Sequence, residues 1–293
     1  MNYFNIKNIT KIQVVSCIML FIFLYVYFKN DKLEFFQSNK KIVSIYSPES
    51  YFGIGDYIRG IIYLYQNEKE RDIFINYETN EISKYLYNGL QNTYKEIDEC
   101  KILPTDELNY HLQIRNNKDD VIYVHNNAAI TYPIKPDIIN QIKKMFMMKP
   151  DMEKEFNDKL SMLTVDNNFV ILHIRLDDDV FVNDTLKYFD RLINYIEEEI
   201  IPIHKSNVMV ISNSTLTKEY ICNRYNFSQF KIDPIHTGAV GKFSPDDIKD
   251  TLIEFFTISK SKHIYQFCET PGHISGFSKR IAEIYNINFD QIN

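Results

Sequence analysis

Tryptophan is absent from this 293-residue chain, cysteine is scarce, and positive charge is not in excess. The formal net charge of -6 argues against a nucleic-acid-binding protein, which would normally present a basic surface. The four cysteines, Cys17, Cys100, Cys222 and Cys268, are too widely spaced for a zinc signature or a disulfide-dense scaffold. Their spacing favours an interpretation as small buried hydrophobic side chains.

The remaining composition is that of an ordinary globular protein, with 45% hydrophobic and 25% charged residues. A chain of this length can bury a substantial core and can form two domains. Tyrosine and phenylalanine each occur 21 times, and asparagine, isoleucine and lysine are abundant. This bias is typical of an AT-rich genome and carries no functional information.

An uninterrupted apolar segment lies near the N-terminus. Residues 12–28 approach the roughly 17-residue lower limit for a membrane-spanning helix, and no small-residue cleavage site follows them. We therefore predict a transmembrane signal anchor at 12–28, between a short tail at 1–11 and a polar stem at 29–41. Lysines flank both ends, so flanking charge does not fix the orientation. We expect a single-pass type II protein of the secretory pathway, in the ER or Golgi.

Strand-like and helix-like segments alternate after the stem. The predicted strands are 42–46, 72–77, 120–125, 168–175, 207–212, 230–233 and 263–267, and helical patterns include 81–90, 185–200, 246–259 and 277–285. Such alternation predicts parallel sheets with helices on both faces. The prediction is an α/β chain of two facing Rossmann-like domains, residues 42–148 and 149–293, with a cleft between them.

The stretch at residues 168–180, NFVILHIRLDDDV, begins as an apolar run typical of a buried parallel strand. His173 and Arg175 lie two residues apart, so they point to one face at the carboxyl end, where open α/β sheets bind ligands. The planar guanidinium of arginine matches phosphate oxygens. The alternative is that His173 is a hydrogen-bonded residue of the sheet end and Arg175 forms an ion pair with the aspartates.

A glycine-rich turn joins the first predicted strand to a helix and contains Gly53, Gly55 and Asp56. This arrangement can bring backbone N–H groups close to a phosphate. The turn is neither GxGxxG nor a Walker loop, so a simple helix start is the alternative. Ser212 and Asn213 lie at the end of a neighbouring strand and are candidates for lining the same cleft.

Taken in order, these motifs resemble the superfamily of GDP-fucose-dependent fucosyltransferases, which includes α-1,2, α-1,6 and protein O-fucosyl enzymes. His173-Ile-Arg175 with Asp178 and Asp179 resembles the HxR motif. Residues 252–254, ending in Glu254, resemble the helix whose acidic residue reads guanine. Residues 274–283 resemble the closing serine-helix segment, and residues 53–56 lie where the family has a glycine turn. The collinear resemblance spans about residues 42–285.

The resemblance implies the GT-B arrangement, with the acceptor on the N-terminal domain and the donor GDP-fucose on the C-terminal one. It also implies inverting transfer of fucose to a glycan or glycoprotein, with no metal or other cofactor. Arg175 would hold the pyrophosphate and neutralise the GDP leaving group. His173 would contact the nucleoside side, Glu254 would accept from guanine N–H groups, and Ser275 would bind phosphate at a helix N-terminus.

Two positions depart from the family pattern. Asn183 stands where the α-1,6 enzymes have a glutamate, and Leu176 replaces the second arginine of many α-1,2 enzymes. The general base is therefore unassigned, with Asp178, Asp179 and Asp56 as candidates to take the acceptor proton.

Two further hypotheses remain open. Asp177, Asp178 and Asp179 could form a DxD-type metal site, because carboxylate oxygens suit hard cations, although a solvated loop is the plainer interpretation. The second hypothesis is a membrane-anchored binding protein of the same fold without turnover, which Asn183 in place of a glutamate would permit.

Overall fold

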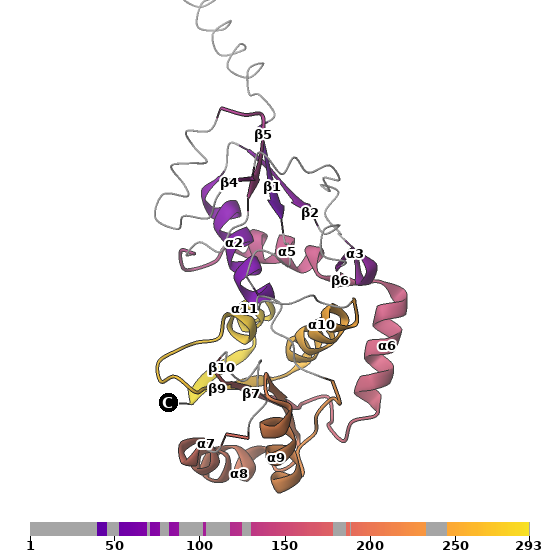
Figure 1. Ribbon diagram of the computed structural model, residues 1–293, viewed down its shortest axis with the longest axis vertical. Coiled ribbons are helices and arrows are strands. Elements are labelled where there is room, and N and C mark those ends of the chain that lie inside the picture. The colour runs from indigo at the N-terminus through magenta and orange to yellow at the C-terminus, as the bar shows by residue number, and fades with distance from the viewer. Residues whose placement is uncertain are drawn as a thin grey trace, which may run out of the picture.

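The computed structural model describes residues 40–45, 53–68, 71–76, 82–87, 102–103, 118–124, 130–177, 186–187, 189–232 and 245–292 (Figure 1). The predicted anchor at 12–28 lies outside the described residues, as do Asp178, Asp179 and Asn183. Within the described ranges, no helix is both long enough and apolar enough to span a bilayer.

The N-terminal lobe is built on a four-stranded parallel sheet in the order β2-β1-β5-β4. Its strands are β1 (Lys41–Ile45), β2 (Asp72–Asn76), β4 (Ile102–Leu103) and β5 (Val121–Val124). Parallel strands are covered on both faces, and residues 42–45 of β1 are accordingly buried. Helix α2 (Ile54–Asn67) has Gly53 as its N-cap residue, so Gly55 and Asp56, which the sequence placed in a turn, lie in the first turn of this helix.

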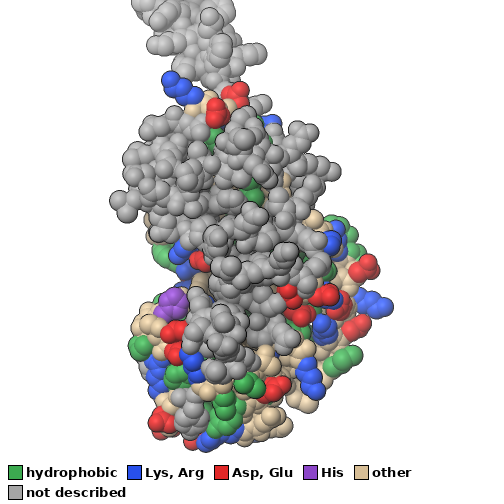
Figure 2. Space-filling model, in the orientation of Figure 1, with side chains coloured by type: hydrophobic (Ala, Val, Ile, Leu, Met, Phe, Trp, Pro, Cys, Tyr) green, Lys and Arg blue, Asp and Glu red, His purple; other side chains and the backbone are tan. Residues whose placement is uncertain are grey.

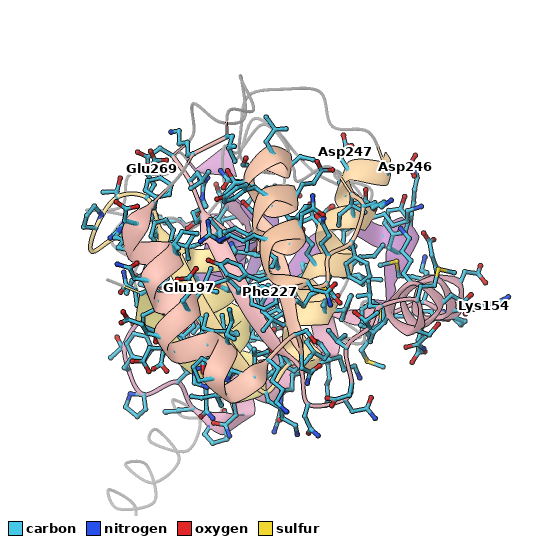
Figure 3. All side chains as sticks on the ribbon, turned by 90° about the horizontal axis from the view of Figure 1, so that it is seen from below. Lys154, Glu197, Phe227, Asp246, Asp247 and Glu269 are labelled. Atoms are coloured by element: carbon cyan, nitrogen blue, oxygen red, sulfur yellow. The ribbon has the colours of Figure 1, made fainter. Side chains whose placement is uncertain are left out.

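The C-terminal lobe contains a second parallel sheet in the order β10-β9-β7-β8. Its strands are β7 (Val170–Arg175), β8 (Val208–Ser212), β9 (His263–Cys268) and β10 (Asn288–Ile292). The helical segments are α7 (Asp190–Tyr195), η5 (Ile196–Ile200), α8 (Ile201–His204), α9 (Thr215–Tyr225), α10 (Pro245–Lys260) and α11 (Gly276–Tyr285). Figure 3 shows α7 and α9 covering one side of this lobe. The predicted parallel α/β fold is confirmed.

Further predicted details were wrong. The helix expected at 185–200 begins only at Asp190, the first residue of α7. The strand expected at 230–233 is replaced by a single bridge between Met209 and Ser228. The helix expected at 81–90 ends early: α3 (Ile82–Tyr85) stops where β3 (Leu86–Tyr87) pairs with β6 (Met147–Met148). Strand β10 was missed because it is an edge strand whose alternate residues are polar and partly exposed, which weakens the apolar signal.

The two lobes are packed together as well as connected by the chain. One apolar core runs from α2 and α5 (Pro136–Met145) in the first lobe to α10 and α11 in the second. Phe146 stacks on Phe255 across this junction, with ring centroids 4.9 Å apart. Helix α6 (Pro150–Ser161) runs along the side of the molecule from one lobe to the other (Figure 1). The division at residue 148 stays a prediction.

The N-terminal ends of α2 and α11 meet at two glycines. A Cβ atom on Gly55 would lie 2.5 Å from the carbonyl carbon of Gly276 and 2.5 Å from the backbone nitrogen of Phe277. Only glycine permits so close an approach of two backbones. Gly55 is therefore required by helix packing between the lobes, beside the cavity described below.

Charged side chains of both signs are interspersed over the described surface seen in Figure 2. This face shows no concentration of lysine and arginine among the described residues, which agrees with the net charge of -6.

Candidate functional site

A cavity of about 730 Å³ lies between the two lobes. Its walls come from the start of α2, from Tyr132, from the ends of β7 and β8, from one face of α10, and from the first half of α11 with the turn before it. All nine described residues that the sequence proposed for donor binding line it: Gly53, Gly55, Asp56, His173, Arg175, Ser212, Asn213, Glu254 and Ser275. The fold thus brings together motifs more than 200 residues apart in the chain. The role of each residue stays a prediction.

His173 is buried, and it points to the same face of β7 as Arg175. Its Nδ1 lies 2.7 Å from the hydroxyl of Ser278 on α11. Burial, followed by the nearby positive charge of Arg175, lowers the pKa of His173 to about 3. The imidazole is therefore neutral at physiological pH and does not contribute charge to the site.

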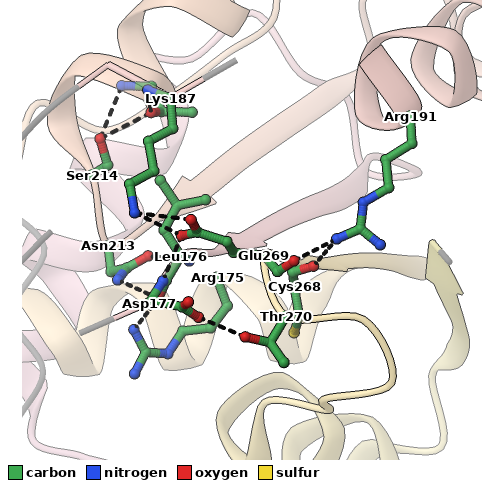
Figure 4. A network of polar contacts seen from close by, with 11 residues as sticks. Arg175, Leu176, Asp177, Lys187, Arg191, Asn213, Ser214, Cys268, Glu269 and Thr270 are labelled. Carbon is green, nitrogen blue, oxygen red and sulfur yellow. Dashed lines mark hydrogen bonds and ion pairs between the residues drawn. The ribbon is translucent and has the colours of Figure 1, made fainter. Parts of the chain in front are cut away.

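Arg175 ends β7 and is held close to its own strand (Figure 4). Its Nη1 donates to the carbonyl oxygen of Leu176 at 2.6 Å. The Asn213 side chain accepts from the backbone nitrogen of Leu176 at 2.8 Å and donates to the carbonyl oxygen of Leu176 at 3.0 Å. Asn213 lines the cavity, but its amide is engaged by the backbone that follows Arg175. Its function in this structure is to position that strand end.

Glu269, which the sequence did not single out, fixes the backbone beyond β7 and β9 (Figure 4). Its carboxylate accepts from the ammonium of Lys187 at 2.9 and 3.0 Å and from the backbone nitrogen of Asp177 at 2.9 Å. The carboxylate of Asp177 accepts from the hydroxyl of Thr270 at 3.0 Å. Asp177, one of the three candidate DxD aspartates, thus makes a structural contact. Among the described residues there is no group of three or more metal-ligating side chains.

Glu254 projects from α10 into the cavity wall. Burial raises the pKa of this carboxyl to about 7, although the ammonium of Lys218 opposes the shift. Lys218 is itself only 2% exposed and donates to the carbonyl oxygen of Ile232 at 2.8 Å. Near neutral pH, Glu254 is consequently divided between a carboxylic acid and a carboxylate.

The N-terminus of α11 faces the cavity. Ser275 is the N-cap residue, and its hydroxyl makes no capping bond. The first-turn N–H groups of a helix have no intrahelical acceptor, and Gly276 and Phe277 in this turn both line the cavity. These donors and the positive end of the helix dipole create a site suited to a phosphate group.

Another part of the cavity lining carries charges of both signs. Arg59 and Asp56 form a contact of 3.4 Å on α2. Tyr132 donates from its hydroxyl to Glu283 at 2.6 Å and accepts from the guanidinium of Arg280 at 2.5 Å. Of these residues, only Asp56 was proposed from the sequence. Donors and acceptors side by side suit a ligand rich in hydroxyl groups.

No protein-family model matches the sequence, and no curated protein matches it. Solved structures of similar fold do exist. Fucosyltransferase NodZ from Bradyrhizobium has a TM-score of 0.54 and 9% sequence identity, over 83% of this chain and 91% of that one. NodZ alpha-1,6-fucosyltransferase co-crystallized with GDP gives a TM-score of 0.51 at 9% identity, over the same shares of the two chains. A mutant of Arabidopsis thaliana FUT1 in complex with GDP gives 0.52 at 10% identity, over 86% of this chain and 70% of that one.

At such low sequence identity, the structural similarity establishes the fold alone. The chain has the α/β fold of the GDP-fucose-dependent fucosyltransferases, and the resemblance stated from its motifs is confirmed at that level. Each motif that carried the resemblance contributes described residues to the cavity lining.

Proposed function

We propose that the protein is a glycosyltransferase that moves fucose from GDP-fucose to a hydroxyl group of a glycan or protein. The observation that supports this most is the convergence of the nine candidate residues on one cavity between the lobes. A volume of about 730 Å³ is within the usual range for small-molecule sites. The fold supplies the precedent, because solved structures that share it include complexes with GDP.

The donor chemistry follows from the walls of the cavity. Arg175 and the N-terminus of α11 offer donors to a diphosphate, and both stabilise the negative charge that develops on GDP as it leaves. Glu254, as a carboxylate, accepts hydrogen bonds from the N–H groups of guanine. His173, being neutral, completes the wall as a hydrogen-bonding group.

In the proposed reaction the acceptor oxygen attacks C1 of fucose, and the bond from C1 to the phosphate oxygen of GDP breaks. The acceptor proton passes to a carboxylate. Asp56 is the candidate base within the described part of the chain, and Asp178 and Asp179 are the others. In this proposal the protein is anchored by residues 12–28 as a type II protein of the secretory pathway, where acceptor glycoproteins are found.

A ligand panel tests the proposal directly. Melting temperatures of the purified protein would be measured with GDP, GDP-fucose, GDP-mannose and UDP-sugars. Selective binding to the folded state stabilises it by about 2.7 kcal/mol at a ligand concentration of 100 Kd. We expect GDP and GDP-fucose to raise the melting temperature and UDP-sugars to leave it unchanged. A response to UDP-sugars alone would refute the proposal.

The same preparation distinguishes the two alternatives. GDP binding without transfer or hydrolysis of GDP-fucose would identify a binding protein. Loss of transfer in EDTA would identify a DxD-type enzyme. We expect transfer to be unaffected by EDTA, because Asp177 is engaged with Thr270 and because, in this proposal, Arg175 and the N-terminus of α11 neutralise the donor phosphates.

The pH dependence of GDP binding is a further prediction. Only the carboxylate form of Glu254 accepts from guanine, and the pKa of this group is about 7 in the free protein. GDP affinity should therefore increase by about tenfold between pH 6 and pH 8. The stability of the free protein should change in the opposite direction. The pKa of Glu254 is higher in the folded protein than in the unfolded chain. The contribution of Glu254 to the free energy of unfolding is therefore full at acidic pH and is lost as pH rises through about 7.

Isothermal titration of the wild type and of Glu254→Gln would measure this effect. The terminal phosphate of GDP itself titrates at about pH 6, so the variant is needed to correct for the titration of the ligand. The variant should bind GDP weakly, with only the residual pH dependence of the ligand. Glu197→Gln, on the exposed surface, is the matched control. An equal pH response in wild type and Glu254→Gln would exclude guanine reading by Glu254.

A further inference from the structure

Gln266 lies at the centre of β9, is fully buried, and does not line the cavity. Its side chain nevertheless contacts the residues that do. The carbonyl oxygen of its amide accepts from the backbone nitrogen of Ser275 at 2.9 Å, and the amide nitrogen donates to the carbonyl oxygen of Ser275 at 3.2 Å. Gln266 therefore holds the N-cap of α11 by both of its backbone groups.

These contacts fix the orientation of the Gln266 amide. The backbone nitrogen of Ser275 is a donor, so the atom it reaches must be the amide oxygen, Oε1. The other amide atom, Nε2, is then the nitrogen, and it donates to the hydroxyl oxygen of Ser278. An amide flip would place two donors against each other at Ser275 and is excluded.

The position of the Ser278 proton follows. Among the described residues, the Ser278 hydroxyl has two hydrogen-bond neighbours, Gln266 Nε2 and His173 Nδ1. Gln266 Nε2 can only donate, so the hydroxyl proton has His173 Nδ1 as its acceptor. Helical hydroxyls elsewhere, such as those of Thr257 and Ser259, instead donate to backbone carbonyls three or four residues earlier. Ser278 makes no such bond within the described chain.

We infer that Gln266 and Ser278 are positioning residues that lock His173 in the tautomer with its proton on Nε2. Because Nδ1 is used as an acceptor from Ser278, Nε2–H is the ring donor that remains for the cavity that His173 lines. The same Gln266 amide orients the first turn of α11. The hydrogen-bonded series Gln266–Ser278–His173 thus positions two sets of donors at the cavity. They are the Nε2–H group of His173 and the N–H groups in the first turn of α11.

This inference deepens the proposed function. A permanent neutral donor beside Arg175 selects an oxygen acceptor, such as a phosphate or ribose oxygen of the donor nucleotide. It also excludes His173 as the base that takes the acceptor proton, because its Nδ1 is engaged and its Nε2 is already protonated. The low pKa of about 3 agrees with a ring that stays neutral.

The tautomer can be measured in the free protein, so the inference can be tested without relying on activity. Nitrogen-15 NMR of histidine-labelled full-length protein distinguishes the two neutral tautomers and the imidazolium, and His173→Gln identifies the signal. We expect the wild type at pH 7 to show His173 neutral, with Nε2 protonated. A proton on Nδ1, or on both nitrogens, would overturn the inference.

Ser278→Ala tests the link to ligand binding. Loss of the hydroxyl should populate the second tautomer and weaken GDP binding by about tenfold, since one oriented donor is no longer fixed. Ser261→Ala removes the hydrogen bond of another buried serine, directly after the end of α10. This variant should change neither the tautomer of His173 nor the affinity for GDP. Unchanged GDP affinity in Ser278→Ala would overturn the positioning role. If the wild type binds no GDP, the proposed function fails, and the NMR result alone decides the tautomer.

Discussion

Arg175→Ala is expected to lower kcat/KM for fucosyl transfer by about a thousandfold or more while leaving the fold intact. The guanidinium lines the cavity at the end of β7, next to the donors of α11. Removing one group that stabilises charge developing in a transition state typically costs about 10²–10³ in rate, and here the same group also binds the ground-state diphosphate. Arg175 is the last residue of β7 and lines the cavity, so its truncation leaves the buried apolar residues of the strand in place.

Two companion variants make this result interpretable. Arg175→Lys keeps the charge but loses the planar pair of donors, so its activity should lie between wild type and alanine. Arg224→Ala removes an exposed arginine that pairs with Glu197, and it should be neutral. Steady-state kinetics with GDP-fucose, together with circular dichroism, would measure both properties. Wild-type activity in a folded Arg175→Ala protein would exclude a direct role for this side chain.

Gly55→Ala is expected to lower the free energy of unfolding by about 3 kcal/mol, at the upper end of the usual cost of overpacking. The new Cβ would lie 2.5 Å from two backbone atoms of α11, and backbone atoms cannot rotate away as a side chain can. Helices α2 and α11 must separate, and the walls of the cavity separate with them. GDP affinity should fall together with stability.

Gly276→Ala is the matched control for this variant. Its Cβ would lie 3.7 Å from Asp56 Oδ1 and 3.9 Å from the carbonyl carbon of Gly55, which are ordinary contact distances. Urea denaturation of both variants would measure the difference. Equal stability of Gly55→Ala and wild type would show that the helices can separate at no cost.

The parts of the fold that the sequence predicted are those with strong local signals. The apolar runs of β1, β7, β8 and β9 are buried strands of parallel sheets, whose composition is distinctive. Edge strand β10 carries alternating polar residues and could not be separated from a loop by the same criterion. The early end of α3 depends on pairing with Met147 and Met148, more than 60 residues away.

The candidate site shows the same distinction. His173, Arg175 and Glu254 could be proposed because each belongs to a short motif with a chemical meaning. Gln266 and Glu269 could not, because their importance lies in partners such as Ser278 and Lys187 that only the folded chain brings near. A glutamine inside an apolar strand, as in HIYQFC, is the signal that could have identified Gln266, since a buried amide requires partners.

A crystal structure of the protein with GDP would show directly whether Arg175 and α11 bind the diphosphate. We expect the diphosphate to lie in the cavity between the lobes, with its oxygens within about 3 Å of the Arg175 guanidinium and of N–H groups at the start of α11. We also expect guanine to lie against Glu254. GDP bound elsewhere, or bound in this cavity with its phosphates remote from Arg175 and α11, would contradict the proposed binding mode.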